Sequence, residues 1–206
     1  MALRGNFPLR QERVSAPSPP KLELIVNQSN QVVVKLAQAY HFAASRHVDH
    51  RRKGESAEPY MNHLTEVAEL AAAASGGNDP AIVIAAVLHD TVEDTATTFA
   101  ELEQRFGADV VGLVAEVTDD KSLPKQVRKD LQVEHAAHAS PRAQIIKMAD
   151  KISNLRSLAA SPPAGWSDQR IAEYGAWAAR VVDPCKGAST ELARLFEIAL
   201  ADLTTG

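Results

Sequence analysis

The sequence LHDTVEDT, residues 88–95, places a histidine and three acidic side chains directly after the apolar run AIVIAAVL. If this run is a helix, His89 and Asp90 lie at its end and can point at one object. One further helical turn would bring Glu93 and Asp94 under them, at the i, i+4 spacing. Carboxylates this close repel one another, and burying them is costly unless a cation pairs with them. We therefore predict a metal site at this helix end.

Two residues on other expected helices are candidates for completing the ligand set. His63 lies in register with Val67 and Leu70, beside the buried side of its helix. Asp150 lies at the border of a later apolar stripe. Alone, each could have a purely structural role, His63 as a satisfied core histidine. A nitrogen and oxygen set without thiolate suits manganese, iron or zinc, and it favours an octahedral ion that retains water.

The elements that must position these residues are predicted to be helices, because apolar residues recur at helical spacing along most of the chain. The expected helix starts are Ser29 or Asn30, Pro59, Asp79, Thr98, Asp109, Ser140, Ser167 and the STE sequence at 189–191. The segment AIVIAAVLHD is apolar on every face and should be central. The charged segment 121–138 is expected to be solvated. With no alternating strand pattern, the predicted fold class is all-α.

Composition narrows the function classes. The 206 residues are 45% hydrophobic and 23% charged, which fits one domain, and the net charge of -4 gives no support for nucleic acid as a partner. The single cysteine, Cys185, excludes an internal disulfide framework and suggests a reducing, cytoplasmic location. No segment reaches the ~18 apolar residues of a membrane span. Residues 1–27, which lack the apolar core of a secretory signal, are expected to form a flexible tail before a domain at 28–206.

The order of histidine, His–Asp pair and aspartate along the chain is the ligand pattern of the HD-domain phosphohydrolases, and the chain resembles them. The sequences RRKGESAEPYMNH, AAVLHDTVEDT, FGADVVGLVAEVTDDKSLPK, IIKMADKISNLRSL and GWSDQRIAEYGAWAARVV resemble the hydrolase domain of the RelA/SpoT alarmone enzymes. They are most similar to the single-domain small alarmone hydrolases, from about residue 28 to residue 200. This resemblance implies an HD-domain helical bundle.

The resemblance also implies a role for each candidate residue. The expected ligands of one Mn²⁺ ion per chain are His63, His89, Asp90 and Asp150. The expected catalytic acidic pair is Glu93 and Asp94, of which either could orient or deprotonate the metal-activated water.

The expected substrate contacts are a basic pair near the phosphates, Arg52 and Lys53, and a nucleotide contact, Asn154. Without the resemblance, the run containing Arg52 and Lys53 would be a solvated loop. Ser157 stands where relatives carry Thr or Asp, which bears on the fine geometry of these contacts. Trp166 and Trp177 are expected to be packing residues.

The implied activity is removal of the 3′-pyrophosphate from ppGpp or pppGpp, giving GDP or GTP plus pyrophosphate. The chain has no room for a synthetase domain, so a hydrolase without synthesis is expected. One alternative is another phosphohydrolase activity at the same site, such as removal of the 2′-phosphate from NADPH. A less favoured alternative is a catalytically inactive module that binds a nucleotide. The sequence leaves the oligomeric state open.

Overall fold

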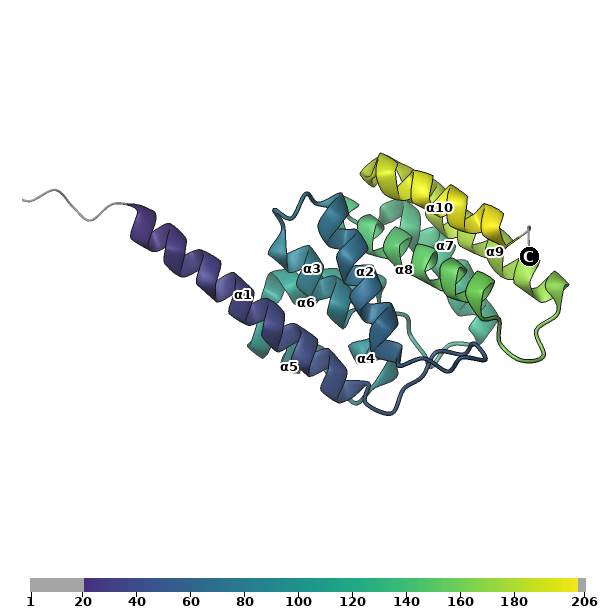
Figure 1. The fold of residues 1–206 in the computed structure, drawn as a ribbon, viewed down its shortest axis with the longest axis horizontal. Coiled ribbons are helices and arrows are strands. Elements are labelled where there is room, and N and C mark those ends of the chain that lie inside the picture. The colour runs from purple at the N-terminus through teal and green to yellow at the C-terminus, as the bar shows by residue number, and fades with distance from the viewer. Residues whose placement is uncertain (1–20, 204–206) are drawn as a thin grey trace, which may run out of the picture.

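The computed structural model describes residues 21–203, with side chains described from residue 31. In chain order the elements are α1 (Lys21–Arg46), α2 (Tyr60–Ala74), α3 (Pro80–Leu88), α4 (Thr91–Asp94), α5 (Phe99–Phe106), α6 (Ala108–Val117), α7 (Lys125–His138), α8 (Pro141–Ala160), α9 (Asp168–Val182), the 3₁₀ helix η1 (Asp183–Ala188) and α10 (Thr190–Asp202) (Figure 1). The all-α prediction is confirmed. Among the described residues, no helix has both the length and the apolar character that crossing a bilayer requires.

The predicted helix starts are mostly correct, because their capping side chains form the expected hydrogen bonds. The side-chain oxygens of five capping residues each accept from the backbone N–H three positions later: Asp79, Thr98, Ser140, Ser167 and Ser189. Such oxygens satisfy backbone donors that have no partner within the helix. Local sequence therefore sets where these helices begin.

The predicted start of α1 is wrong. This helix begins at Lys21 rather than after Ser29 or Asn30, and its first part extends beyond the other helices (Figure 1). No proline or glycine lies between Lys21 and Arg46, so nothing in the chain interrupts the helix, and polar residues inside it have only a small helical cost. Residues 1–20, which hold most of the predicted tail, lie outside the described residues.

The segment 121–138, expected to be solvated, contains α7. Its helical character is hidden in the sequence because Ala136 is its buried residue and charged side chains dominate the rest. α7 packs against α9 through long charged side chains: the ammonium nitrogen of Lys129 lies 4.7 Å from the ring centroid of Trp177. The stems of such residues cover apolar surface while the charged ends stay accessible.

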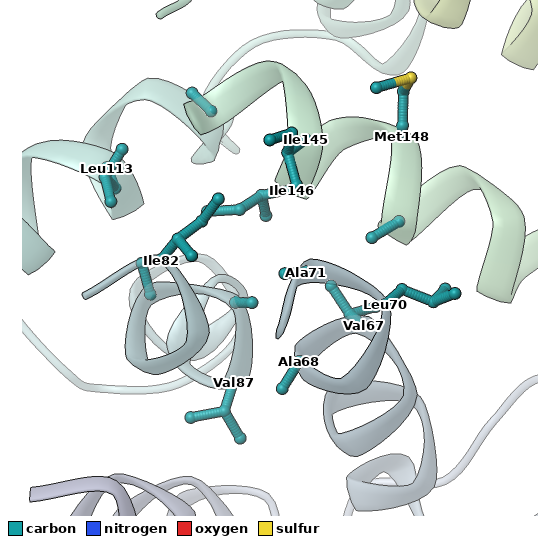
Figure 2. Close-up of a cluster of buried hydrophobic side chains, with 14 of the residues drawn as sticks. Val67, Ala68, Leu70, Ala71, Ile82, Val87, Leu113, Ile145, Ile146 and Met148 are labelled. Carbon is teal, nitrogen blue, oxygen red and sulfur yellow. The ribbon is translucent and has the colours of Figure 1, made fainter. Parts of the chain in front are cut away.

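The apolar helix α3 is central, as predicted. Its buried residues include Ile82, Ile84 and Val87, and α1, α2, α6 and α8 pack around it. Figure 2 shows the part of this core to which α2, α3, α6 and α8 contribute side chains. A helix enclosed on every side has little freedom to shift, so its last residues are held firmly.

Arg142 ties the beginnings of three helices together. Its guanidinium donates to both carboxylate oxygens of Asp79, at 2.7 and 2.8 Å, and to both of Asp109, at 2.7 and 3.1 Å. Asp79 caps α3, Asp109 lies in the first turn of α6, and Arg142 lies in the first turn of α8. This fork holds the starts of α3, α6 and α8 in register at the end opposite to the LHDTVEDT sequence.

The packing of α5 gives a stability prediction. Leu102→Ala should lower the free energy of unfolding by about 2–5 kcal/mol, because Leu102 is fully buried and its truncation leaves a cavity. Phe99→Ala on the same helix is the control, since that side chain is 40% exposed and should cost much less. Urea denaturation followed by circular dichroism measures both. Equal losses for the two variants would contradict this description of the core.

Candidate active site

The predicted ligands come together from three parts of the fold: α2, the junction of α3 with α4, and α8. His89 Nε2 lies 3.1 Å from Asp90 Oδ2 and 3.9 Å from Asp150 Oδ1. His63 Nε2 lies 3.3 Å from Asp150 Oδ1 and 3.8 Å from Asp90 Oδ2. Ligand atoms of His63, His89 and Asp90 all lie within 4.8 Å of one another. Two ring nitrogens and two carboxylate oxygens therefore converge on one small region.

A break between α3 and α4 allows the adjacent residues His89 and Asp90 to direct their side chains to the same region. α3 ends at Leu88, His89 keeps helical angles, and Asp90 turns to φ −97° and ψ −2° before α4 adds one more turn. The backbone N–H of Asp94 still donates to the carbonyl of Asp90, at 2.9 Å. The acidic pair on α4 therefore remains one turn beyond the ligands, as the i, i+4 spacing predicted.

The hydrogen bonds around His89 fit a bound cation. Its Nδ1 lies 2.7 Å from the carbonyl of Ala86, and because a carbonyl only accepts, Nδ1 carries the hydrogen. The lone pair is then on Nε2, which is buried and has no hydrogen-bond partner among the described residues. Tyr60 meanwhile donates to Asp90 Oδ2 at 2.5 Å, which holds that carboxylate in place. A basic nitrogen left unsatisfied beside carboxylates fits the donor set of a divalent metal ion.

The pKa values of His89 and Asp90 also indicate that a positive charge is favoured at this place. Burial disfavours a charged His89, yet Asp90 and Asp150 outweigh burial and raise its pKa to about 9. Burial also acts against ionisation of Asp90, but His89 holds the pKa of that carboxyl well below its usual range. The carboxylates therefore attract a proton onto His89, at the place where a divalent cation would supply the charge instead.

A buried lysine holds the second oxygen of Asp150. Lys151 Nζ donates to Asp150 Oδ2 at 2.8 Å and to Gln132 Oε1 at 3.1 Å, and it lies 4.6 Å from the Trp177 ring centroid. Burial lowers the pKa of Lys151, but Asp150 and its other partners more than compensate and keep the ammonium charged. With Oδ2 engaged in this way, Oδ1 of Asp150 is turned toward the histidines.

The acidic residues of α4 have different surroundings. Glu93 Oε2 accepts from the backbone N–H of Asp119 at 3.1 Å, and its Oε1 lies 3.8 Å from Arg128 Nη1. Burial raises the pKa of Glu93 to about 7, although the Asp119 N–H opposes this. Asp94 forms an ion pair with Lys121, whose Nζ also lies 4.0 Å from Glu93 Oε1. Glu93 can therefore exchange a proton near neutral pH.

The predicted phosphate and nucleotide contacts also lie beside the ligands. Arg52 Nη1 donates to Asn154 Oδ1 at 3.0 Å, and Asn154 Nδ2 donates to Asp150 Oδ1 at 2.6 Å. The loop that carries Arg52 and Lys53 rests on the end of α8, where a Cβ at Gly54 would lie 2.2 Å from the carbonyl oxygen of Ser161. Only glycine fits this approach, which places the basic pair at the site.

All of the site residues predicted from the sequence, except His63, line one open cavity of about 1050 Å³. The cavity is also lined by basic and aromatic side chains that the sequence reasoning did not assign to the site: Lys121, Lys125, Lys129, Trp166, Arg170, Tyr174 and Trp177. Trp166 and Trp177, expected to be packing residues, thus also face the cavity. The i, i+4 spacing of Lys125 and Lys129 was the signal that could have indicated a basic helix face. A cavity lined by both a metal-ligand set and several cations suits a polyphosphate ester.

Comparison with known proteins identifies the family of the chain. The family model described as HD domain matches residues 39–176. The chain is 50% identical over 157 residues to the guanosine-3′,5′-bis(diphosphate) 3′-pyrophosphohydrolase MESH1 of Xenopus tropicalis, which covers 76% of this chain and 88% of that protein. It is also 50% identical to human MESH1 over 158 residues, or 77% of this chain and 88% of the relative.

A solved structure has the same fold. It is described as a metazoan orthologue of SpoT that hydrolyses ppGpp, and it matches with a TM-score of 0.78 and 43% identity. The match covers 81% of this chain and 94% of that one. The chain therefore belongs to the HD-domain family, in the branch that contains the MESH1 proteins.

Proposed function

We propose that the chain is a metal-dependent hydrolase that removes the 3′-pyrophosphate of ppGpp or pppGpp, giving GDP or GTP plus pyrophosphate. The observation that carries this proposal is the convergence of the His63, His89, Asp90 and Asp150 ligand atoms beside Glu93 and a basic cavity wall. The MESH1 relatives, at about half identity, are named for the same activity.

The ligand set of this proposal is His63, His89, Asp90 and Asp150, holding one Mn²⁺ ion. Two imidazoles and two carboxylates without thiolate suit manganese, which accepts mixed nitrogen and oxygen ligands. When bound, the ion supplies a water of lowered pKa and positive charge against the phosphate oxygens. The residues 28–206 form the catalytic domain in this proposal, and the free thiol of Cys185 supports a cytoplasmic location.

Glu93 is the general base in this proposal. Oε2 is held by the Asp119 N–H, so Oε1 is the atom that takes the proton from the attacking water. The water oxygen bonds to the phosphorus next to the ribose, the bond from that phosphorus to the 3′-oxygen breaks, and the 3′-oxygen takes up a proton from solvent in the open cavity to become a hydroxyl. Asp94 holds Lys121 at the rim of the cavity through their ion pair. The basic pair Arg52 and Lys53 offsets the charge of the departing pyrophosphate.

The substrate and the metal are tested together. With Mn²⁺ the purified chain should release GDP and pyrophosphate from ppGpp, chelation should abolish the reaction, and added Mn²⁺ should restore it. Metal analysis should find one ion per chain. Kinetics with NADPH under the same conditions provide the comparison, and a larger kcat/KM for NADPH than for ppGpp would overturn the proposed substrate.

Replacing the base should affect the chemical step. Glu93→Gln should lower kcat about 10²–10⁴-fold, because the amide keeps the shape but cannot take a proton. Asp94→Asn is the matched variant and should mainly raise KM, since it loosens Lys121 rather than removing the base. Steady-state kinetics with measured Mn²⁺ content separate these effects. A Glu93→Gln enzyme with normal kcat would exclude Glu93 as the base.

The pH dependence follows from the raised pKa of Glu93. A carboxyl with a pKa of about 7 is neutral in acid and ionises as the pH rises, so kcat/KM should increase with pH along a limb set by this group. A bound cation favours the ionised form, which places the midpoint at or below about pH 7. The profile of kcat/KM between acid and neutral pH measures it. A midpoint well above neutrality would contradict the assignment.

A further inference from the structure

Behind His63, on the side away from the carboxylates, lies a buried serine followed by a glutamate. His63 Nδ1 is 2.9 Å from Ser153 Oγ, and Ser153 Oγ donates to Glu66 Oε2 at 2.6 Å. His63 is 2% exposed and Ser153 1% exposed, so the bond between them is shielded from water, whereas the Glu66 side chain is 31% exposed. The three groups form a continuous chain of hydrogen bonds between α2 and α8.

The chemistry of these three side chains determines which atom donates in each hydrogen bond. A carboxylate only accepts, so the single hydrogen of the Ser153 hydroxyl is directed to Glu66. The hydroxyl oxygen must then accept from His63, which places the ring hydrogen on Nδ1. The lone pair of His63 is therefore on Nε2, the atom that lies 3.3 Å from Asp150 Oδ1.

A second contact anchors the glutamate. Arg156 Nη1 donates to Glu66 Oε1 at 2.8 Å, so α8 engages both carboxylate oxygens. On α2, Glu66 follows His63 by three positions, and on α8 Arg156 follows Ser153 by three, so each pair lies on one helix face. The packing of α2 against α8 thus determines the orientation of the His63 ring.

The Nδ1 atom of His89 has a different kind of hydrogen-bond acceptor from that of His63. Its Nδ1 donates to the carbonyl of Ala86 within its own helix turn, and a carbonyl carries no net charge. His63 is instead connected through one hydroxyl to a carboxylate. A carboxylate that accepts, even through one intermediate, increases the electron density of an imidazole and its strength as a ligand.

We propose that Ser153 and Glu66 are positioning residues for the metal: they hold His63 in the tautomer that presents Nε2 and strengthen that nitrogen as a ligand. This inference rests on the metal site of the proposed function. It assigns to the α2–α8 contact a role in metal affinity that is separate from the chemistry of Glu93. Neither Ser153 nor Glu66 lines the cavity.

The test is the Mn²⁺ affinity of the full chain, measured by titration calorimetry. Ser153→Ala should weaken Mn²⁺ binding about 10–100-fold, since loss of such an outer partner commonly has this effect. Glu66→Gln should weaken it less, because its amide oxygen still accepts from Ser153 but the charge is lost. Ser153→Thr retains the hydroxyl and should restore affinity, and Glu69→Gln, on the same helix, is the charge control.

Kinetics separate positioning from a general loss of structure. At saturating Mn²⁺, Ser153→Ala should recover most of the wild-type kcat with an unchanged KM for ppGpp. Wild-type Mn²⁺ affinity in Ser153→Ala, or failure of Ser153→Thr to rescue the loss, would overturn the inference while leaving the proposed function intact. A wild-type chain that binds no Mn²⁺ would overturn both.

Discussion

The structure depends on keeping two carboxylates, Asp90 and Asp150, close together in a largely buried place. Their oxygens lie within 4 Å of the same two imidazole nitrogens, so the region requires positive charge and directed hydrogen-bond donors. Each carboxylate has such support: Tyr60 donates to Asp90, and Lys151 and Asn154 donate to opposite oxygens of Asp150. The surrounding helices are arranged to deliver these donors while leaving the imidazole nitrogens free to bind.

The apolar helix α3 holds His89 and Asp90 in place because it is enclosed on all sides. A core helix would normally avoid charge, but here the enclosed part holds the backbone rigid and the end of the helix projects His89 and Asp90 into the cavity. The turn at Asp90 then directs Glu93 on α4 toward the connector between α6 and α7. The same rigid element thus positions ligands and base, and their separation does not depend on a mobile loop.

The net charge of the chain conceals a strong local pattern. With an overall charge of -4, the molecule nevertheless has basic side chains from α7, α8 and α9 along one cavity, which is also lined by Asp90 and by Glu93 and Asp94 of α4. The connector before α7 joins the two groups: Gln132 donates to Asp119 Oδ2 at 2.5 Å and accepts from Lys151. The basic and acidic side chains of the cavity are therefore connected by hydrogen bonds.

By itself, the sequence determined the all-α class, the capped starts of α3, α5, α8, α9 and α10, the central place of α3 and the set of candidate ligands. These features depend on periodicity and on contacts between near neighbours in the chain, which a sequence displays directly. Only the tertiary structure decided the partners of those ligands, such as Ser153 and Glu66 behind His63 and Lys151 beside Asp150. The lysine and tryptophan wall of the cavity was also hidden, as was the helical state of α7. Such partners come from helices far apart in the chain, and their meeting depends on how those helices pack rather than on any local pattern.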